Sequence, residues 1–544
     1  MSAGAGASPA AARHTVTKRP WPAAAARQAA ALACGALQGL SIAWPDGGGP
    51  LAWLQVASLA GLVLLLRAPG VGQAFVTGWV FATAWLCTVF WWLFISMNTY
   101  GHLPAWLSAL SVLLLAAFLG SNYALAAAAC KRWPAAGGAF GFAAWWTIAE
   151  LARGWLWTGF PWGAVGYAHV DGWLAAWAPW VGVYGIGAIA ALAAAALAQG
   201  LVAPAPASRA AGRARWLPAL LALAIMLAGF ALPAQHSRDA GEFEVSLLQG
   251  NISQDQKFRA GGGIELALRW YGEQLLAVQR GLVVAPETAI PLLPAQWPPG
   301  LRERLDRHFD DPGRAALIGV PWGDPGVYAN SVIGLRAGAA AYRYDKHHLV
   351  PFGEFVPPLF GWFTRAMRIP LGEFQAGAAA QPSLHWQGQR LAPNVCYEDL
   401  FGEELARRFA VPAEAPTVLV NVSNIAWFGD TVAIAQHLHI ARMRTLEFQR
   451  PMVRATNTGA TVVIDHRGEV THGVPSQVRA VARGTVRGQQ GLTPYAAWVS
   501  AWGLLPLWAL CVAVLLGCGA VARARRPACD AGTLESGAAP PPGR

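Results

Sequence analysis

The chain has 544 residues, of which 55% are hydrophobic and only 13% are charged. Soluble domains carry about a quarter of charged residues, so the composition argues against an entirely soluble protein and favours membrane residence. The net charge of +11 does not indicate nucleic-acid binding. Residues 238–492 hold 25 basic and 24 acidic side chains, so the positive excess lies in tails and short loops.

The first half of the chain is a series of apolar stretches. Residues 1–26 are rich in Ala, Gly and Pro, and we expect a disordered cytoplasmic tail there. A membrane-spanning helix needs about 20 apolar residues, which predicts seven spans within 27–236, an eighth at 495–522 and a second cytoplasmic tail at 523–544. The individual stretches are 28–44, 50–66, 72–96, 103–129, 135–153, 174–202, 216–234 and 496–521.

Basic residues alternate between the predicted connections. The N-terminal tail, the second, fourth and sixth connections and the C-terminal tail carry Arg or Lys, whereas the first and third carry none and the fifth carries only Arg153. This alternation predicts that both ends of the chain are cytoplasmic and that the segment after the seventh span is extracytoplasmic. Glu150 and Arg153, three residues apart, are either functional charges at membrane depth or a pair that satisfies itself near the outer surface.

Residues 242–490 have the pattern of one soluble α/β domain. Short β-rich runs alternate with helical stretches at 264–279 and 431–448, which favours a layered fold. The expected strands are 243–248, 282–285, 315–320, 330–335, 340–344, 391–395 and 417–422.

Three chemically active residues of this domain follow apolar runs. Glu287, Lys346 and Cys396 each stand where such a run gives way to a turn, a place where layered α/β folds present side chains for chemistry. A carboxylate could take the thiol proton, the thiolate could attack a carbonyl carbon, and an ammonium could stabilise the resulting oxyanion. Taken singly, each residue is more often a surface carboxylate, a solvated ammonium or a core thiol.

The remaining cysteines fit packing or incidental positions rather than chemistry. The sequence contains no CxxC pair and no His/Cys cluster that would indicate a metal site, and we expect no cofactor. These six residues are Cys34, Cys87, Cys130, Cys511, Cys518 and Cys529.

The local sequences around the three residues resemble those of the apolipoprotein N-acyltransferases, an integral-membrane branch of the nitrilase (carbon–nitrogen hydrolase) superfamily. The matching stretches are 248–252 (LQGNI), 285–289 (APETA), 344–354 (YDKHHLVPFGE), 394–398 (NVCYE), 421–424 (NVSN), 436–444 (QHLHIARMR) and 454–459 (RATNTG), together with 158–162 (TGFPW) in the apolar half. The chain departs from the expected pattern at Ile425, where an aspartate is expected, at Ile434-Ala435 in place of Gly-Pro, and at Phe258 in place of tryptophan.

The resemblance implies a membrane domain of about eight helices joined to a periplasmic αββα sandwich, in a multi-pass protein of the bacterial cytoplasmic (inner) membrane. It implies that Cys396, activated by Glu287, takes an acyl chain from a phospholipid, typically phosphatidylethanolamine, while Lys346 stabilises the tetrahedral intermediates. The acyl thioester would then pass to the α-amino group of the N-terminal diacylglyceryl-cysteine of an apolipoprotein. Glu354, Tyr397 and Glu398 match supporting positions, although they could equally make ordinary structural hydrogen bonds.

Other functions remain open at this point. A membrane-anchored nitrilase-type amidase would use the same three residues with water as the acceptor. A transporter would place polar residues along several helices, and intramembrane charge here is almost limited to Glu150 and Arg153. A non-catalytic lipoprotein-binding paralogue would not need the three residues. We expect a monomer that binds phospholipid and lipoprotein and no nucleic acid.

Overall fold

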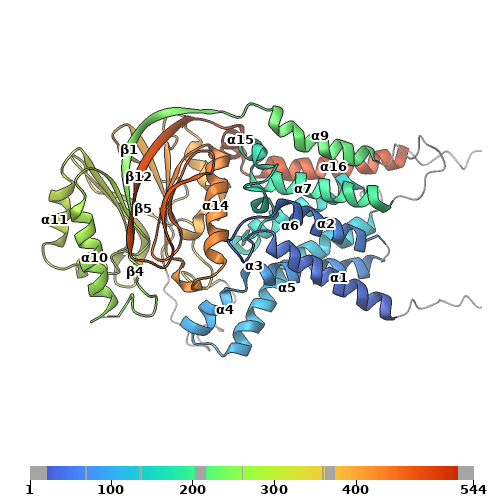
Figure 1. Cartoon of the computed structure of the whole chain (residues 1–544), viewed down its shortest axis with the longest axis horizontal. Coiled ribbons are helices and arrows are strands. Elements are labelled where there is room, and N and C mark those ends of the chain that lie inside the picture. The colour runs from blue at the N-terminus through green and yellow to red at the C-terminus, as the bar shows by residue number, and fades with distance from the viewer. Residues whose placement is uncertain are drawn as a thin grey trace, which may run out of the picture.

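The computed structural model describes residues 21–67, 70–133, 138–202, 216–259, 261–357, 361 and 374–524. The parts of the expected tails at 1–20 and 525–544 lie outside these described residues, as do Cys529 and the basic residues of the sixth connection at 203–215. The described chain forms a helical region at one end and a two-sheet region at the other (Figure 1).

Each predicted apolar stretch contains a helix within the described residues. Four of these helical segments are long and apolar enough to cross a membrane: Val71–Phe90, Ala105–Arg132, Ala175–Leu201 and Leu505–Ala524. The helices of the first half are α1 (Trp21–Leu40), α2 (Ala52–Leu65), α3 (Val71–Phe90), α4 (Leu93–Ile95), α5 (Ala105–Arg132), α6 (Ala139–Trp155), α7 (Ala178–Val202) and α9 (Leu217–Ala231). The expected number of eight spans is therefore not confirmed by helix length and composition.

The first and the last helical stretches differ from those expected. Helix α1 begins at Trp21, so residues 21–26 are helical rather than part of the tail, because this alanine-rich stretch favours a helix. The stretch expected as a single span at 495–522 forms α15 (Pro494–Trp502) and α16 (Leu505–Ala524). Gly503 separates them with φ = +57°, and Pro506 occupies the first turn of α16.

The Glu150–Arg153 pair is buried inside the helical region. Arg153 Nη2 lies 3.4 Å from Glu150 Oε1, and its Nη1 donates to the backbone oxygens of Phe160 (2.7 Å) and Trp162 (2.9 Å). The Tyr123 hydroxyl bonds to the same Glu150 oxygen and accepts a hydrogen bond from Arg153 Nε. Glu150 and Arg153 thus pair with each other, as one of the two sequence interpretations expects, and Arg153 holds the loop that follows α6. The position of the pair near the outer surface stays a prediction.

Two six-stranded mixed sheets form the second region. The first has the order β12-β1-β2-β3-β4-β5 and the second the order β11-β10-β9-β8-β7-β6, with parallel pairs in the middle of each sheet. The strands are β1 (Ser237–Gln249), β2 (Gly281–Ala285), β3 (Arg314–Asp324), β4 (Val327–Arg336), β5 (Tyr342–Asp345), β6 (Leu384–Trp386), β7 (Gln389–Val395), β8 (Val418–Ser423), β9 (Met452–Thr456), β10 (Thr461–Ile464), β11 (Val470–Val474) and β12 (Ala480–Gly491).

The two sheets face each other across an apolar core and are covered by helices on their outer faces. Val284 of β2 and Val395 of β7 belong to the core between the sheets. Helices α10 (Gly263–Ala277) and α11 (Leu301–Phe309) cover the first sheet, and α14 (Ala433–Phe448) and α15 cover the second. The central strands β2, β8 and β9 are buried along their whole length, as continuous apolar runs predict, whereas β11 and β12 expose many of their side chains.

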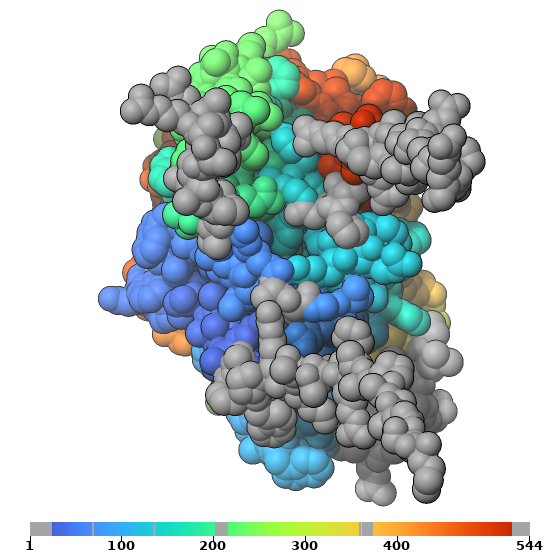
Figure 2. Space-filling view, turned by 90° about the vertical axis from the view of Figure 1, so that its right-hand side faces the viewer, coloured from blue at the N-terminus to red at the C-terminus, as the bar shows by residue number. Residues whose placement is uncertain are grey.

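Helix α14 lies between the second sheet and the helical region (Figure 1). The described chain begins at α1 and ends at α16, both at the end of the helical region that faces away from the sheets. Seen from that end, green residues of α9 and red residues of α16 lie above the blue residues of the first helices (Figure 2). Helices from the N-terminal half and α16 from the C-terminal end therefore build one helical region.

Candidate active site

The three residues predicted for chemistry meet between the two sheets. Glu287 follows β2 of the first sheet, Lys346 follows β5 of the same sheet, and Cys396 follows β7 of the second. Lys346 Nζ lies 3.8 Å from Glu287 Oε1, and the charge of each interacts with the Cys396 sulfur. The facing sheets bring together residues that are up to 109 positions apart.

Cys396 occupies a sharp turn at the end of β7. Its φ of +53° is unusual for a residue other than glycine, and such conformations cluster at functional sites. The Ser423 hydroxyl lies 3.2 Å from its sulfur. The residue is partly exposed. Desolvation of the sulfur and the negative charge of Glu287 raise the pKa of the Cys396 thiol to about 12, although Lys346 and Ser423 oppose this effect. The thiol is therefore protonated at rest and needs a base.

Two donors hold the Glu287 carboxylate. Asn330 Nδ2 donates to Oε1 at 2.7 Å, and the backbone N–H of Asn424 donates to Oε2 at 2.8 Å. Glu287 is 8% exposed. A carboxylate held in this way has a fixed direction beside the thiol, which suits a general base.

Lys346 is paired mainly with Glu354 rather than with Glu287. Its Nζ lies 2.8 Å from Glu354 Oε2 and 2.9 Å from Oε1. Burial alone would lower the pKa of Lys346, but the carboxylates of Glu354 and Glu287 raise it above its ordinary value. The ammonium therefore stays charged at any physiological pH. Glu354 is itself anchored, since its Oε2 accepts from the Val350 N–H at 2.8 Å.

Glu398 connects the loop that follows β5 and begins with Lys346 (the Lys346 loop) to the turn at the end of β7 that bears Cys396 (the Cys396 turn). Its oxygens accept hydrogen bonds from the N–H groups of Val395 (2.6 Å) and His347 (2.7 Å) and from the Tyr344 hydroxyl (2.9 Å). These bonds occupy both oxygens, so the geometry favours a structural role for this residue. Burial raises the pKa of the Glu398 carboxyl, and the two N–H donors oppose this shift.

Tyr397 connects the nucleophile turn to the helical region. Its hydroxyl donates to the backbone oxygen of Gly159 at 3.0 Å, and its ring stacks on Phe160 with centroids 6.2 Å apart. The loop it contacts is the one that Arg153 holds. The turn that bears Cys396 is thereby in contact with the helical region.

A buried polar network lies behind Cys396 and was not predicted from the sequence. His437 Nε2 lies 3.0 Å from Asp399 Oδ1 and 3.2 Å from the Cys396 backbone oxygen. Both partners are acceptors, so Nε2 carries the proton. Arg454 Nη1 donates to Asp399 Oδ2 at 2.9 Å. His437 and Arg454 lie within stretches that carry the family resemblance, but no local pattern indicates that they meet Asp399.

Other residues at the site were also missed. Ser423 and Asn424 belong to the stretch 421–424 that carried the resemblance, without a role being expected for either. Asn330 is the first residue of the expected strand 330–335 and lies inside β4, a position that gives only a weak signal. Lys257 lies in an irregular turn after β1, where periodicity carries no information, and its Nζ donates to the Glu287 backbone oxygen at 3.0 Å.

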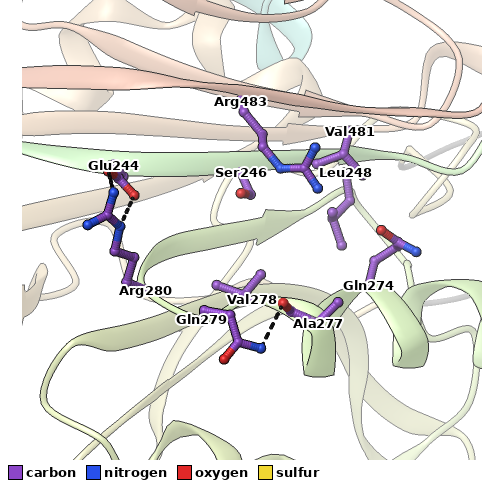
Figure 3. Close-up of a pocket in the computed structure, with 10 residues that line it drawn as sticks. All are labelled: Glu244, Ser246, Leu248, Gln274, Ala277, Val278, Gln279, Arg280, Val481 and Arg483. Atoms are coloured by element: carbon purple, nitrogen blue, oxygen red, sulfur yellow. Dashed lines mark hydrogen bonds and ion pairs between the residues drawn. The ribbon is translucent and has the colours of Figure 1, made fainter.

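A surface pocket elsewhere on the domain contains none of the predicted site residues. It is bounded by β1, β12 and the end of α10, and the Arg280–Glu244 ion pair lies along one edge (Figure 3). The Arg483 side chain extends over it from β12. The expected chemistry therefore belongs to the cluster of Glu287, Lys346 and Cys396 and not to this pocket.

Two family models match the chain. The model described as the apolipoprotein N-acyltransferase N-terminal domain matches residues 34–196, and the carbon-nitrogen hydrolase model matches residues 245–489. The first match falls in the helical region and the second in the two-sheet region.

Relatives of similar length cover most of the chain. An apolipoprotein N-acyltransferase of Verminephrobacter eiseniae is 56% identical over 87% of this chain and 92% of that protein. One of Ralstonia nicotianae is 44% identical over 87% of this chain and 90% of that protein. Among solved structures, a CN-hydrolase superfamily protein of Xanthomonas campestris is 20% identical, with a TM-score of 0.35, over 45% of this chain and 90% of that chain.

Proposed function

Since this chain belongs to the apolipoprotein N-acyltransferase family, we propose that it moves an acyl chain from a membrane phospholipid to the α-amino group of lipoproteins. The acyl chain passes through a thioester on Cys396. The acceptor is the N-terminal diacylglyceryl-cysteine of an apolipoprotein, and the donor is phosphatidylethanolamine.

The observation that carries this proposal is a cluster of a buried base, a buried cation and a partly exposed thiol, in which the thiol-bearing turn contacts the helical region. Glu287 and Lys346 are 8% and 1% exposed, and their charges are 3.8 Å apart. Tyr397, next to the thiol, bonds to Gly159 of the helical region. A phospholipid cannot readily leave the bilayer, because each buried CH₂ is worth about 0.8 kcal/mol. An enzyme that uses it needs its nucleophile near the membrane surface.

The first half-reaction transfers the acyl chain to sulfur. Glu287 takes the proton of the Cys396 thiol, and the thiolate attacks the ester carbonyl carbon. Lys346 stabilises the negative charge on the carbonyl oxygen of the tetrahedral intermediate. The C–O bond then breaks, and Glu287 returns the proton to the departing lysophospholipid oxygen.

The second half-reaction uses the same groups in the opposite order. The lipoprotein amine attacks the thioester carbon while Glu287 accepts a proton from the nitrogen. Lys346 again stabilises the oxyanion, the C–S bond breaks, and the sulfur recovers its proton. Glu354 orients Lys346, Glu398 holds the Lys346 loop to the Cys396 turn, and Tyr397 holds that turn to the helical region.

The charge pattern and the arrangement of helices support a placement of the protein in the membrane. Eight spans, seven within 27–236 and one within 495–522, cross the bacterial inner membrane, with the catalytic domain at 242–490 in the periplasm and both ends cytoplasmic. The position of α1 and α16 relative to the sheets is compatible with this topology (Figure 1). The protein is proposed to act as a monomer, since the reaction written above needs no residue of a second copy.

The experiment that tests this function supplies both substrates to the purified full-length protein in detergent. The acceptor is a synthetic peptide with an N-terminal diacylglyceryl-cysteine, and the donor is phosphatidylethanolamine. We expect an N-acylated peptide and an equal amount of lysophospholipid. Release of free fatty acid without acylated peptide would instead mean that water is the acceptor and would contradict the proposal.

A further inference from the structure

Lys257 is a second buried lysine at the site. It lies in the turn between β1 and α10 and is 1% exposed. Within the described part of the chain its Nζ makes one hydrogen bond, to the Glu287 backbone oxygen at 3.0 Å. The sequence contains only four lysines among its 40 basic residues, and two of them, Lys257 and Lys346, lie at this site. A buried ammonium bound to one neutral carbonyl is costly, so its presence at the site points to a function.

The charges around Lys257 indicate what that function is. Burial lowers the pKa of Lys257 to about 8, while the charges of Glu287 and Cys396 act in the opposite direction. Lys257 therefore lies within electrostatic range of the Glu287 carboxylate and of a Cys396 thiolate. Lys346, the other cation, makes its short contacts with Glu354 rather than with Glu287.

Without Lys257 the cluster would have too much negative charge for a thiolate. Glu287 and Glu354 carry two negative charges, which Lys346 alone cannot balance. When Glu287 takes the thiol proton, the negative charge moves from the carboxylate to the sulfur, and the charge of Lys257, whose Nζ bonds to the Glu287 backbone oxygen, favours the negative group before and after the transfer. The Asp399–His437–Arg454 network faces the Cys396 backbone oxygen from the other side.

We propose that Lys257 is a second active-site cation, which stabilises the Cys396 thiolate after Glu287 has accepted its proton. The inference concerns the site of the proposed acyltransferase, but it is tested on the thiol itself. The competing interpretation is that Lys257 only holds the Glu287 backbone in place. That role requires the hydrogen bond of Lys257 but not an effect of its charge on the Cys396 sulfur.

The test measures the rate at which iodoacetamide alkylates Cys396 between pH 6.5 and 10 in the purified full-length protein, with mass spectrometry of the Cys396 peptide. Lys257→Met removes the charge with little change in side-chain volume. It is expected to slow alkylation at pH 7.5 by about tenfold, which corresponds to a shift of the profile by about one pH unit. Lys257→Arg, which keeps the charge, is expected to stay within about threefold of the wild type.

Arg259→Met is the matched control, because Arg259 is an exposed cation two residues away in the same turn. It should leave the profile unchanged. A Lys257→Met protein that keeps the wild-type melting temperature and profile would overturn the proposal.

If Lys257→Met does not fold, the pH profile of Lys257→Arg still tests the proposal. The wild-type rate should rise less than tenfold per pH unit above pH 8, where Lys257 loses its proton. Lys257→Arg should restore the full tenfold rise, because a guanidinium does not titrate there. Identical profiles for the two proteins would contradict the proposal. Alkylation needs no phospholipid or peptide, so a failure of acyl transfer in the wild type remains distinguishable from a failure of this inference.

Discussion

Lys346 lies a full ångström closer to Glu354 than to Glu287, with its ammonium 2.8 Å from the first carboxylate and 3.8 Å from the second. The two carboxylates share this cation and the Asn330 amide, whose Nδ2 donates to Glu287 Oε1 at 2.7 Å and to Glu354 Oε1 at 2.8 Å, but only Glu354 makes a close ion pair with Lys346. Glu354 neutralises Lys346, and Glu287 keeps its carboxylate directed by Asn330 and Asn424. This division gives each carboxylate a different task in the proposed reaction.

Glu354→Gln tests that division. With its closest partner neutral, Lys346 is expected to move towards Glu287 and weaken that carboxylate as a base. The rate of thioester formation on Cys396 should fall by about 100-fold. Intact-mass measurement of the protein after mixing with phosphatidylethanolamine gives the rate. The control is Glu303→Gln, an exposed residue of α11. Thioester formation within twofold of the wild-type rate would argue against the division.

Glu398→Gln tests the structural role of Glu398. An amide keeps one acceptor oxygen but loses the charge that strengthens the bonds from Val395, His347 and Tyr344. The expected loss of stability is about 2 kcal/mol, seen as a lower melting temperature in detergent. Glu414→Gln, at an exposed position, serves as the control. An unchanged melting temperature with lost activity would instead assign Glu398 a direct chemical role.

Gly159→Ala tests the contact between the helical region and the nucleophile turn. Gly159 has φ = +79°, and an added Cβ would lie 2.0 Å from the Gly154 backbone oxygen. The loop must shift, which should cost about 2 kcal/mol and disturb the hydrogen bond from Tyr397. We expect a lower melting temperature and slower acyl transfer. Gly72→Ala, in an open position of α3, should change neither. Equal effects of the two substitutions would contradict this account.

His437 predicts a dependence of stability on pH. Burial, aided by the charge of Arg454, lowers the pKa of His437 below its ordinary 6.5 despite the opposing effect of Asp399. The folded state therefore binds fewer protons than the unfolded state below about pH 6.5. The stabilising effect of the neutral imidazole is complete above that pH and is lost as the pH falls.

The comparison needed is between the wild type and His437→Gln, whose amide can still donate to Asp399 but cannot be protonated. The melting-temperature advantage of the wild type should shrink as the pH is lowered from 7 to 5. His385→Gln, at an exposed position, should show a smaller change. A wild-type advantage that does not depend on pH would show that His437 does not titrate on unfolding.

Much of this architecture can be predicted from one-dimensional patterns. Each predicted apolar stretch contains a helix, and Glu287, Lys346 and Cys396 meet because each follows a strand of a two-sheet fold. The division of the last apolar stretch at Gly503 depends on a single backbone conformation, which hydropathy does not show. Lys257 and the Asp399–His437–Arg454 network escaped prediction because their partners come from distant elements. The catalytic roles of the three residues stay predictions.

The most direct test of the account is the mass of the protein after incubation with phosphatidylethanolamine. The wild type should gain the mass of one fatty acyl group, and a diacylglyceryl-cysteine peptide should then remove it. Cys396→Ala should gain nothing. An acyl group that the Cys396→Ala protein also carries, or a wild type that never gains one while it still acylates the peptide, would contradict a thioester on Cys396.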